Sequence, residues 1–543
     1  MTHRRLGSKR LGLRTIQAGA ATLMTLSVSA QAQEKDVATL SDIVVTASGF
    51  EQMIADAPAT ITVIPREELE GRAYRNVTDA LQDIPGVSIE GGAGGKLEST
   101  NITIRGMNES YVLFLVDGKP LGASSEAYYN GFGGDAQVNW LPPVSAIERI
   151  EVIRGPMSSL YGSSALGGVI NIITQKVSDA WTGSVTMDGT LQEHSDSGNS
   201  YQGNYYLSGP LIQDRLGLTL FGSRYQRQED KIEAGYARQR IISNNARFDW
   251  ILNDDHSLRL EAGRTTTDNR RTEQSGGPSD MDNERVNYGL THYWDWGNNS
   301  TETYVINEKV EIENGTNESK YKSTIVNTKT LIPLEAHMIS VGAEYRTEET
   351  DHDASRFPGS KALKLTRWQT ALFAEDEYNI TDNFALTAGV RLDKNEHYGN
   401  HVTPRIYGVY HWNDNLVLKG GVSGGYKTPT LKQSDDGIVE QAGRGRSWDM
   451  GNPNLQPESS TNYELGFAWD TPDNLNFGLM AYHTRFKDKI DKTYVCETPN
   501  GAPPSCTYNG ETRYSIQQYT NVDSATLQGI EATFGMPLGD VRL

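Results

Sequence analysis

The chain has 543 residues, a formal net charge of −19, 54 glycines, 26 tyrosines and two cysteines. A protein that binds nucleic acid needs a basic face, so this acidic balance argues against that class of partner. Beyond the first thirty-odd positions no apolar run reaches the length of about eighteen residues that a transmembrane helix requires. The composition instead suits a β-barrel with a polar interior, whose strands alternate apolar and polar residues.

Residues 1–32 are predicted to be a secretory signal peptide. The basic residues at its start are Arg4, Arg5, Lys9, Arg10 and Arg14. A moderately apolar stretch follows from Ile16 to Ala30, and Ala30-Gln31-Ala32 matches a small-residue cleavage site. An amphipathic N-terminal helix is the alternative. We expect the mature chain to begin near Gln33, outside the cytoplasm, where a disulfide can persist.

A short β-prone segment, DIVVTAS at residues 42–48, precedes any obvious folded domain. A strand on a flexible tether can add its edge to the sheet of another protein, because backbone hydrogen bonds supply most of the affinity in such contacts. The alternative is that this segment forms the first strand of the domain that follows. We therefore expect residues 33–48 to be a tether that carries a docking strand.

Residues 49–177 are predicted to form a compact α+β domain. Asn76-Val77-Thr78-Asp79 resembles a capping box, apolar residues continue at helical spacing to Ile84, and Pro85-Gly86 ends the helix. The predicted strands are Thr60–Ile64, Asn101–Arg105, Val112–Val116, Arg149–Ile153 and Val169–Thr174.

Residues 178–543 contain only β patterns. In residues 462–470, Tyr463 and Leu465 share an apolar face with aromatic ends, while Glu464 lies on the polar face. Residues 383–393 alternate in the same way. A soluble β-sandwich also alternates, so the connections carry more weight. Short turns alternate with long polar loops at roughly 226–240, 266–282, 347–367, 425–459 and 486–520, as they do between the periplasmic and extracellular ends of an outer-membrane barrel, and about sixteen strands fit before Leu543. The predicted fold class is a transmembrane antiparallel β-barrel.

The two cysteines flank a segment rich in proline and glycine within a long loop. In an oxidising compartment, the spacing of Cys496 and Cys506 indicates a disulfide that staples this loop. A metal site would need further ligands nearby, and we expect none.

Several motifs identify a family. In the first domain they are Asp83–Val87, Ile104–Gly106, Val116–Gly118, Arg149–Pro156, Tyr161–Gly162 and Gly167–Thr174; in the second they are Tyr426–Pro429 and Gly451–Glu458. Together they resemble the TonB-dependent outer-membrane receptors over almost the whole mature chain. Within that family the chain is most similar to the catecholate siderophore branch, which includes the enterobactin receptor and the colicin I receptor. The run from Asn139 to Gly168 most resembles the colicin I receptor type.

The resemblance implies a barrel of 22 strands that is occluded by the N-terminal domain, the plug. About sixteen strands are too few, and an open sheet in lipid would leave backbone groups without partners along two edges. We therefore expect the barrel domain, residues 178–543, to be incomplete at its C-terminal end. The alternative is a small barrel that ends at Leu543.

The resemblance also assigns roles to residues. The docking strand corresponds to a TonB box, made of Asp42, Ile43, Val44, Val45, Thr46 and Ala47, and its partner is TonB with the inner-membrane complex that energises it. The plug would be held by an ionic lock of Arg105 and Arg154 with Glu464 and Glu531 of the barrel. The alternative is that these four are unrelated solvated charges.

The ligand implied by the resemblance is a ferric catecholate siderophore, which is cargo, so no cofactor is expected. A large aromatic anion is recognised by Arg or Lys beside aromatic rings at the cell surface. The candidates are Tyr128, Tyr129, Arg270, Arg271, Arg444, Arg446 and Trp448, each of which could equally be a solvated loop residue. Further expected contacts are outer-membrane lipid and, opportunistically, bacteriocins or phages.

Other functions fit less well. Haem receptors of this family tend to carry a His between the two barrel motifs, and residues 430–451 contain none. Cobalamin or another metallophore is a further alternative. A plain porin or adhesin would need neither a plug nor a docking strand. His-Glu-x-x-His and Cys-x-x-Cys motifs are absent, so we do not expect an enzyme.

Overall fold

The structure is a computed structural model that describes residues 44–45, 49–72, 74–91, 100–122, 136–163, 165–315, 317–352, 363–442, 446–471, 475–538 and 541–542. The predicted signal peptide, residues 1–32, lies outside the described residues. In the described part of the chain, none of the helices has the length and apolar character needed to cross a membrane.

The N-terminal domain is built on a five-stranded sheet. Its strand order is β3 (Thr60–Pro65), β8 (Ile147–Arg154), β9 (Gly168–Thr174), β6 (Val112–Val116) and β7 (Lys119–Pro120), with β6 and β9 parallel and the other pairs antiparallel. A separate hairpin joins β4 (Val87–Gly91) to β5 (Thr100–Ile104). The five predicted strands are confirmed, each within two residues at either end.

The predicted helix is α2 (Val77–Leu81), and its first turn is capped because the Asn76 side chain accepts a hydrogen bond from the Asp79 N–H at 3.0 Å. It ends three residues before Ile84, where the chain turns toward Pro85-Gly86. Three further helices were not predicted: α1 (Arg66–Gly71), α3 (Ala136–Asn139) and α4 (Ser158–Tyr161). They have four to six residues, too few for a repeated apolar face to be visible in the sequence.

The central strands of this sheet are buried on both faces. Ile150 and Ile170 pack with Leu81 of α2 in one apolar cluster, while Ile153 and Val169 belong to a second cluster with Leu160 of α4. A strand buried on both faces reads as a nearly continuous apolar run, and β9 was predicted to within one residue. β8 carries four charged residues among its apolar ones, and it starts two residues before the predicted strand and ends one residue after it.

The C-terminal domain is an 18-stranded sheet whose strands follow one another in chain order. Its strands are β10 (Thr182–Thr190), β11 (Ser200–Ile212), β12 (Leu216–Arg227), β13 (Arg238–Ile251), β14 (His256–Arg271), β15 (Ser279–Trp296), β16 (Asn299–Asn314), β17 (Asn317–Pro333), β18 (His337–His352), β19 (Leu363–Thr381), β20 (Phe384–Asn395), β21 (Gly399–Asn413), β22 (Leu416–Lys427), β23 (Ile438–Ala442), β24 (Ser447–Met450), β25 (Glu458–Asp470), β26 (Asn476–Glu497) and β29 (Ser515–Gly535). β23 and β24 form a short hairpin between β22 and β25, which also pair directly. The remaining sixteen strands match the predicted number, and in the described residues β10 and β29 are the two ends of the sheet.

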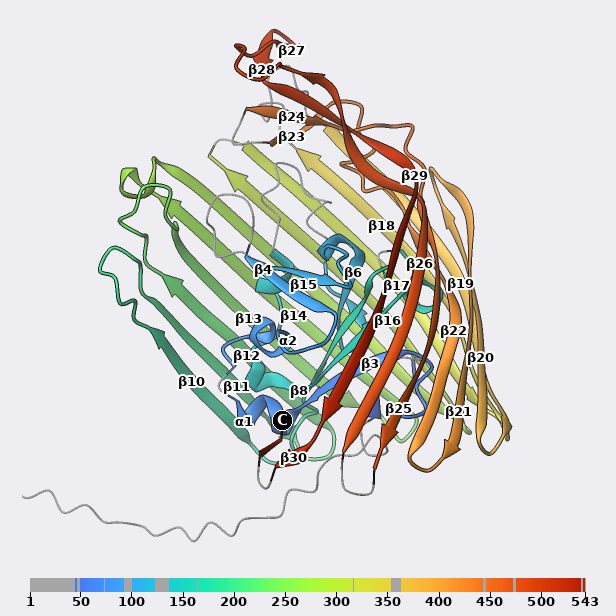
Figure 1. Cartoon of the computed structure of the whole chain (residues 1–543). Helices are drawn as coiled ribbons and strands as arrows, with labels where there is room; N and C mark the ends of the chain where they lie inside the picture. The colour runs from blue at the N-terminus through green and yellow to red at the C-terminus, as the bar shows by residue number, and fades with distance from the viewer. Residues whose placement is uncertain are drawn as a thin grey trace, which may run out of the picture. The chain divides into compact units, whose positions relative to one another are not determined.

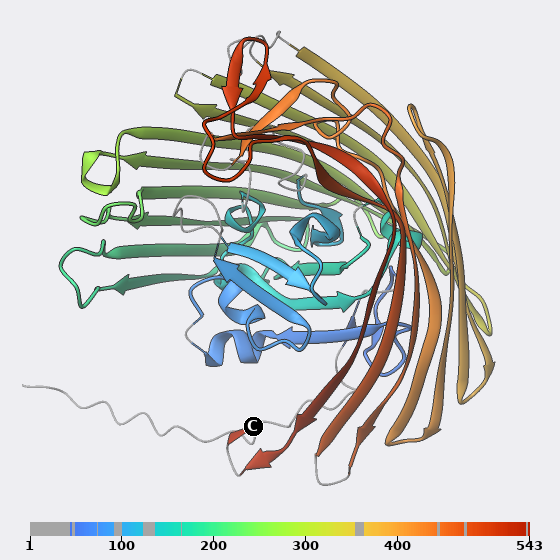
Figure 2. The same cartoon turned by 45° about the horizontal axis from the view of Figure 1, so that its top comes forward.

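The sheet curves around the N-terminal domain, whose strands appear in blue and cyan inside the green-to-red wall (Figures 1 and 2). Alternation along the wall strands sets which side chains face inward. On β20, Val390 and Leu392 are 39% and 50% exposed, whereas Arg391 and Asp393 between and beyond them are 0% and 2% exposed. The outward faces are apolar and the inward faces polar, as predicted for a transmembrane barrel with a plug.

The wall strands run further than the sequence indicated. The predicted loop 266–282 is mostly strand, because β14 continues to Arg271 and β15 begins at Ser279. The predicted loop 486–520 is likewise shortened by β26 and β29, with a small hairpin of β27 (Cys506–Tyr508) and β28 (Glu511–Arg513) at its tip. The buried face of these outer ends is made mostly of polar residues, such as Thr267, Asn269 and Asn283, so backbone pairing continues where the apolar alternation stops.

Candidate functional site

Two tight turns of the plug aim a charged side chain at the barrel wall. Arg105-Gly106 and Asp117-Gly118 both have positive φ at each residue, 50° and 76° in both pairs. This is the backbone of a two-residue hairpin turn, and a non-glycine residue adopts it at a cost of about 1 kcal/mol or more. The contacts of each charged side chain with the wall hold the turn in this conformation.

Arg105 lies between two carboxylates of the wall. Its Nη1 is 2.5 Å from Glu464 Oε1 on β25, and its Nε is 2.8 Å from Glu531 Oε1 on β29. Arg154 at the end of β8 adds a second cation 3.3 Å from Glu531 Oε2. Its Nη2 also donates to Thr62 Oγ1 at 2.8 Å. The structure thus brings together all four residues predicted as an ionic lock, and we refer to them as the Arg105 cluster.

Burial and pairing act in opposite directions on the two arginines. Burial alone lowers the pKa of Arg105, but its hydrogen bond to Glu531 and the charge of Glu464 outweigh this and raise that pKa above its usual value. Burial lowers the pKa of Arg154, which the nearby Glu531 only partly offsets. Arg105 is therefore the cation that the two buried carboxylates stabilise most, and its removal would leave them without their main partner.

Asp117 meets a different part of the wall, at β13 and β14. Its carboxylate accepts hydrogen bonds from the backbone N–H and the hydroxyl of Thr174, both at 2.8 Å. Arg247 of β13 and Arg259 of β14 lie 3.6 and 3.4 Å from the same carboxylate. The sequence reasoning used Val116-Asp117-Gly118 only to identify the family. The turn that it shares with Arg105-Gly106 is the signal that could have marked Asp117 as a contact with the wall.

A second set of contacts lies six residues beyond Arg105. The Tyr111 hydroxyl donates to Glu458 Oε1 at 2.7 Å, and Lys427 Nζ lies 3.0 Å from Ser110 Oγ and 4.0 Å from the centre of the Tyr111 ring. Lys427 and Glu458 face each other across β22 and β25. They belong to the two barrel motifs of the sequence, so both motifs meet the plug at one place, which we call the Tyr111 cluster (Ser110, Tyr111, Lys427 and Glu458).

Replacing Tyr111 by Phe should loosen the plug without unfolding it. The ring and its contact with Lys427 remain, but Glu458 loses a buried hydrogen bond, which costs about 1–3 kcal/mol. Hydrogen exchange of the plug amides should become faster around residues 109–111. Tyr74→Phe is the matched control, since the Tyr74 hydroxyl accepts a hydrogen bond from the half-exposed Arg72 at 3.1 Å. Equal exchange in both variants would contradict the role of Glu458.

The predicted TonB box is described at only two positions. Val44 and Val45 form β1 (Val44–Val45), which pairs antiparallel with β2 (Gln52–Met53); the other residues of the box lie outside the described part of the chain. The segment around β2 is held to the wall through its carbonyl groups. Lys329 Nζ lies 2.5 Å from Gly49 O, and Lys419 Nζ lies 2.7 Å from Ile54 O.

The predicted ligand contacts on the outer loops differ in their surroundings. Tyr128, Tyr129 and Arg444 lie outside the described residues. Arg270 is 2.7 Å from Asp282, with Asp268 and Asp280 also in reach. Arg271 Nη2 donates to Gly235 O at 3.3 Å. Both guanidinium groups therefore already have partners within the protein, and neither offers an unpaired group to a ligand at the outer surface in this conformation.

Arg446 and Trp448 have opposite exposures. The Arg446 guanidinium lies 4.3 Å from the centre of the Tyr514 ring and is exposed. Trp448 is 1% exposed and packs between Arg513 and Tyr508. Trp448 therefore belongs to the core of this loop and is not exposed as a ligand contact would require.

The predicted disulfide between Cys496 and Cys506 is formed, with the two Cα atoms 5.7 Å apart. It lies in a small apolar core with Ile438, Trp448 and Ile516. Among the described residues there is no group of three or more His, Cys, Asp or Glu side chains that could hold a metal ion.

Replacing Cys496 and Cys506 by Ser should loosen the outer loop and leave the barrel intact. The bridge closes a loop of sequence separation 10, for which the loss is about 2–3 kcal/mol of local stability. Limited proteolysis should then cut between residues 497 and 515. The migration of the folded, unheated barrel on gels should stay unchanged. Equal resistance of the variant and the parent would contradict this.

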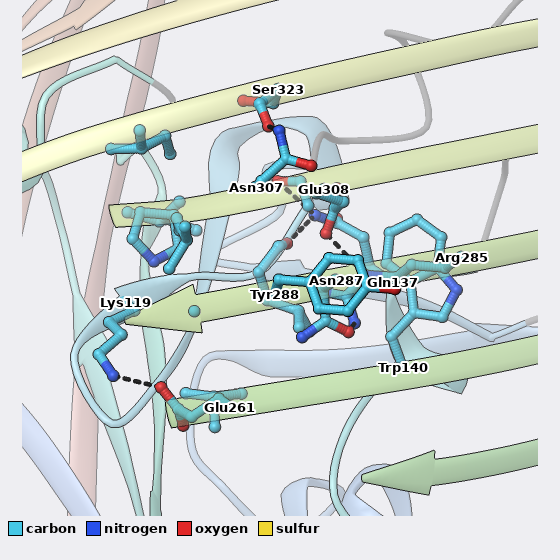
Figure 3. Close-up of a pocket in the computed structure, with 18 of the residues that line it drawn as sticks. Lys119, Gln137, Trp140, Glu261, Arg285, Asn287, Tyr288, Asn307, Glu308 and Ser323 are labelled. Atoms are coloured by element: carbon cyan, nitrogen blue, oxygen red, sulfur yellow. Dashed lines mark hydrogen bonds and ion pairs between the residues drawn. The ribbon is translucent and has the colours of Figure 1, made fainter. Parts of the chain in front are cut away.

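A polar cavity of about 160 Å³ separates the plug from the wall (Figure 3). Lys119 of β7 reaches across it to Glu261 of β14 with a distance of 2.5 Å between Nζ and Oε2. Arg285 of β15 pairs with Glu308 of β16 at 2.6 Å and lies 5.1 Å from the centre of the Trp140 ring of the plug. Sequence reasoning did not find this site, because it depends on how strands distant in sequence face the plug.

Known proteins agree with this architecture. The family model for the TonB-dependent receptor plug domain matches residues 54–169, and the model for the TonB-dependent receptor-like β-barrel matches residues 182–541. The chain is 40% identical over 539 residues to an iron-regulated outer membrane virulence protein of Vibrio cholerae, covering 95% of this chain and 78% of the relative.

Two further matches come from Pseudomonas aeruginosa. The chain is 28% identical over 583 residues to the ferric enterobactin receptor PirA, covering 93% of this chain and 76% of the relative. The crystal structure of the siderophore receptor PirA matches with a TM-score of 0.74 at 27% identity, covering 89% of this chain and 83% of that chain. The protein therefore belongs to the family of TonB-dependent receptors of the outer membrane, with an N-terminal plug domain and a β-barrel domain.

Proposed function

We propose that the protein binds a ferric siderophore of the catecholate type at the cell surface and imports it into the periplasm with energy from TonB. The observation that carries this proposal is the family membership together with the named function of a relative, a ferric enterobactin receptor, over 93% of the chain. The name of the Vibrio relative, which is 40% identical, adds that its production is regulated by iron.

The geometry of the plug supports active import over passive diffusion. The Arg105 cluster and the Tyr111 cluster hold the plug through ion pairs and hydrogen bonds that are largely buried. Breaking such contacts has a cost, and the outer membrane has no ATP or ion gradient of its own. The work therefore comes from a partner across the periplasm. We propose that residues 33–48 are the tether and Asp42–Ala47 the TonB box through which this partner pulls.

The ligand is the cargo and needs no resident cofactor. At the outer surface, Arg446 beside the Tyr514 ring supplies the pairing of a cation and an aromatic group that suits an aromatic anion. We propose Arg446 as a ligand contact, with Tyr128, Tyr129 and Arg444 as further proposals. The same outer loops would be the attachment point for bacteriocins or phages.

Binding of purified receptor to a panel of iron complexes tests the proposal. Quenching of tyrosine and tryptophan fluorescence should be strong with ferric tris-catecholates, and absent with haem and cobalamin. Replacing Arg446 by Gln should weaken the binding, while replacing Arg270 by Gln, whose charge already faces three aspartates, should change it less. Binding of haem or cobalamin alone would assign another substrate. No binding to any member of the panel would favour a porin or an adhesin.

A further inference from the structure

The outward face of the wall changes from apolar to charged along each strand. Strands β14 to β17 lie side by side (Figure 1), and Leu260, Leu290, Val305 and Val326 form one row across them with exposed fractions of 37–47%. Two residues closer to the long loops, Tyr288 is 59% exposed. Aromatic rings in this position mark the edge of the apolar band of an outer-membrane barrel. The band that contacts acyl chains therefore ends just beyond this row.

The next outward row is basic. Four residues beyond the apolar row, β14, β16 and β17 present Arg264, Lys309 and Lys322, whose side chains are 42–63% exposed. At about 3.3 Å per residue and a strand tilt of about 45°, this row lies about 9 Å closer to the cell surface.

Neighbouring strands show the same order. From β12 to β19, the first charged residue that faces outward beyond the apolar row is basic on every strand except β15 and β18. The basic residues are Arg224, Arg240, Arg264, Lys309, Lys322 and Lys364, and the acidic ones are Glu284 and Glu349. The part of the wall nearest the apolar band is thus mainly cationic.

Two of these cations oppose each other. Lys309 and Lys322 are direct partners on the antiparallel strands β16 and β17. Like charges in this position destabilise a sheet. Lys309 pairs with Glu311 at 2.6 Å, and Lys322 pairs at 2.9 Å with Glu349, which Lys364 shares at 2.9 Å. These pairs are partly exposed, and each ammonium group has three donors. An anion held between the two lysines would remove their repulsion.

The membrane around the protein supplies such an anion. The protein belongs to an outer-membrane family, so the outward face of its wall is covered by lipid. The outer leaflet of that membrane contains a glycolipid whose sugar headgroup carries phosphate groups just above the acyl chains. Anionic headgroups attract Lys and Arg close to the membrane surface, and these long side chains reach from the apolar surface to the headgroups.

We propose that Lys309 and Lys322 form a binding site for a phosphate group of the outer-leaflet glycolipid, on the lipid-facing side of the wall at β16 and β17. The acyl chains of the same lipid lie against the row that includes Val305 and Val326, which are direct partners on these two strands. This site is separate from any site for transported cargo, because it faces the membrane and not the interior of the barrel.

Binding of lipid A to the purified full chain in a neutral detergent tests this inference. The probes are bisphosphorylated lipid A, the same lipid with both phosphates removed, and inorganic phosphate alone. Native mass spectrometry gives the bound lipid, and thermal unfolding gives an independent measurement. The variant combines Lys309→Gln with Lys322→Gln. The matched control combines Lys176→Gln with Arg215→Gln, which removes the same charge from two exposed residues outside the wall strands.

The parent should bind bisphosphorylated lipid A on the order of tenfold more tightly than the dephosphorylated form, and the variant should lose about that factor, because each lysine contributes to the attraction of an anionic headgroup. The control should bind as the parent does, and inorganic phosphate should not change the unfolding temperature. Without lipid the variant should unfold at the same temperature as the parent or higher, because the repulsion between the two lysines is gone.

Five results would overturn the inference. Equal binding of the two forms of lipid A would mean that the apolar row alone holds the lipid. Unchanged affinity of the variant would place the phosphate elsewhere, and an equal loss in the control would assign the effect to net charge. Stabilisation by inorganic phosphate alone would make the site one for a free anion. A lower unfolding temperature of the variant without lipid would mean that the two lysines stabilise the wall itself.

Discussion

Replacing Arg105 by Glu is expected to unseat the plug and abolish active uptake. The change would put three carboxylates beside Arg154 as the one remaining cation of the Arg105 cluster, and these side chains are nearly inaccessible to water. Removing one partner of a buried ion pair costs about 3–5 kcal/mol, and the added repulsion increases that cost. Uptake of ferric siderophore should fall to background, and cells should become sensitive to large antibiotics that the outer membrane excludes. Hydrogen exchange should show faster exchange throughout the plug sheet.

The matched control is Arg72→Glu, which reverses a charge on the same domain at its surface. Arg72 is about half exposed and pairs with Asp83 at 2.8 Å. Exposed pairs contribute up to about 1 kcal/mol, so plug protection and uptake should both be close to those of the parent. If Arg105→Glu leaves exchange and uptake unchanged, the four residues do not act as a lock. If Arg72→Glu is equally disruptive, the effect follows from the charge of the plug as a whole.

The parts of the fold that the sequence predicted are those where burial leaves a simple pattern. Strands β8 and β9 lie in the core of the plug, and their fully buried apolar residues, such as Ile150, Ile170 and Ile172, made both strands visible in the sequence. The wall strands have one face in lipid and one in the interior, and their strict alternation placed Glu464 on the inward face, opposite Tyr463 and Leu465. In both cases the environment constrains every residue of the strand.

The parts that were missed have weaker local constraints. In α1, Leu69 is the buried residue, which gives no repeating apolar face. The outer ends of β14 and β15 bury one face, including Thr267, Asn269 and Asn283, but the side chains on both faces are mostly polar, so no apolar alternation is visible in the sequence although backbone pairing continues. These strands are fixed by their neighbours, and a sequence window of ten residues does not contain that information.

The same distinction applies to the site. Arg105, Arg154, Glu464 and Glu531 could be named because they stand in recognisable motifs. The Tyr111 cluster joins residues 347 positions apart, and the cavity brings together β7 and β14, with Lys119 and Glu261 separated by 142 positions. Such contacts depend on the pairing register of many wall strands and on the position of the plug between them. They could be found only in three dimensions.

Replacing Val44 or Val45 by Pro is expected to abolish uptake while leaving ligand binding unchanged. A docking strand binds through its backbone, so the loss of one N–H and the clash of the proline ring should matter more than the loss of the valine side chain.

Uptake of ferric siderophore in these proline variants should fall by at least about tenfold, the effect of losing roughly 1.4 kcal/mol of partner affinity. Fluorescence quenching by the same ligand should give the parent's affinity. Val45→Ala is the control, since it keeps the N–H and should keep most of the uptake.

In the structure Val44 and Val45 pair with Met53 and Gln52 of the same chain. That pairing gives the experiment its second possible outcome: if the proline variants lose ligand binding together with uptake, β1 is a structural strand of the plug and the docking role belongs elsewhere in the tether. Loss of uptake alone would mean that β1 leaves β2 to pair with TonB, and that β2, held by Lys419 through the carbonyl of Ile54, is the point where the pull enters the plug.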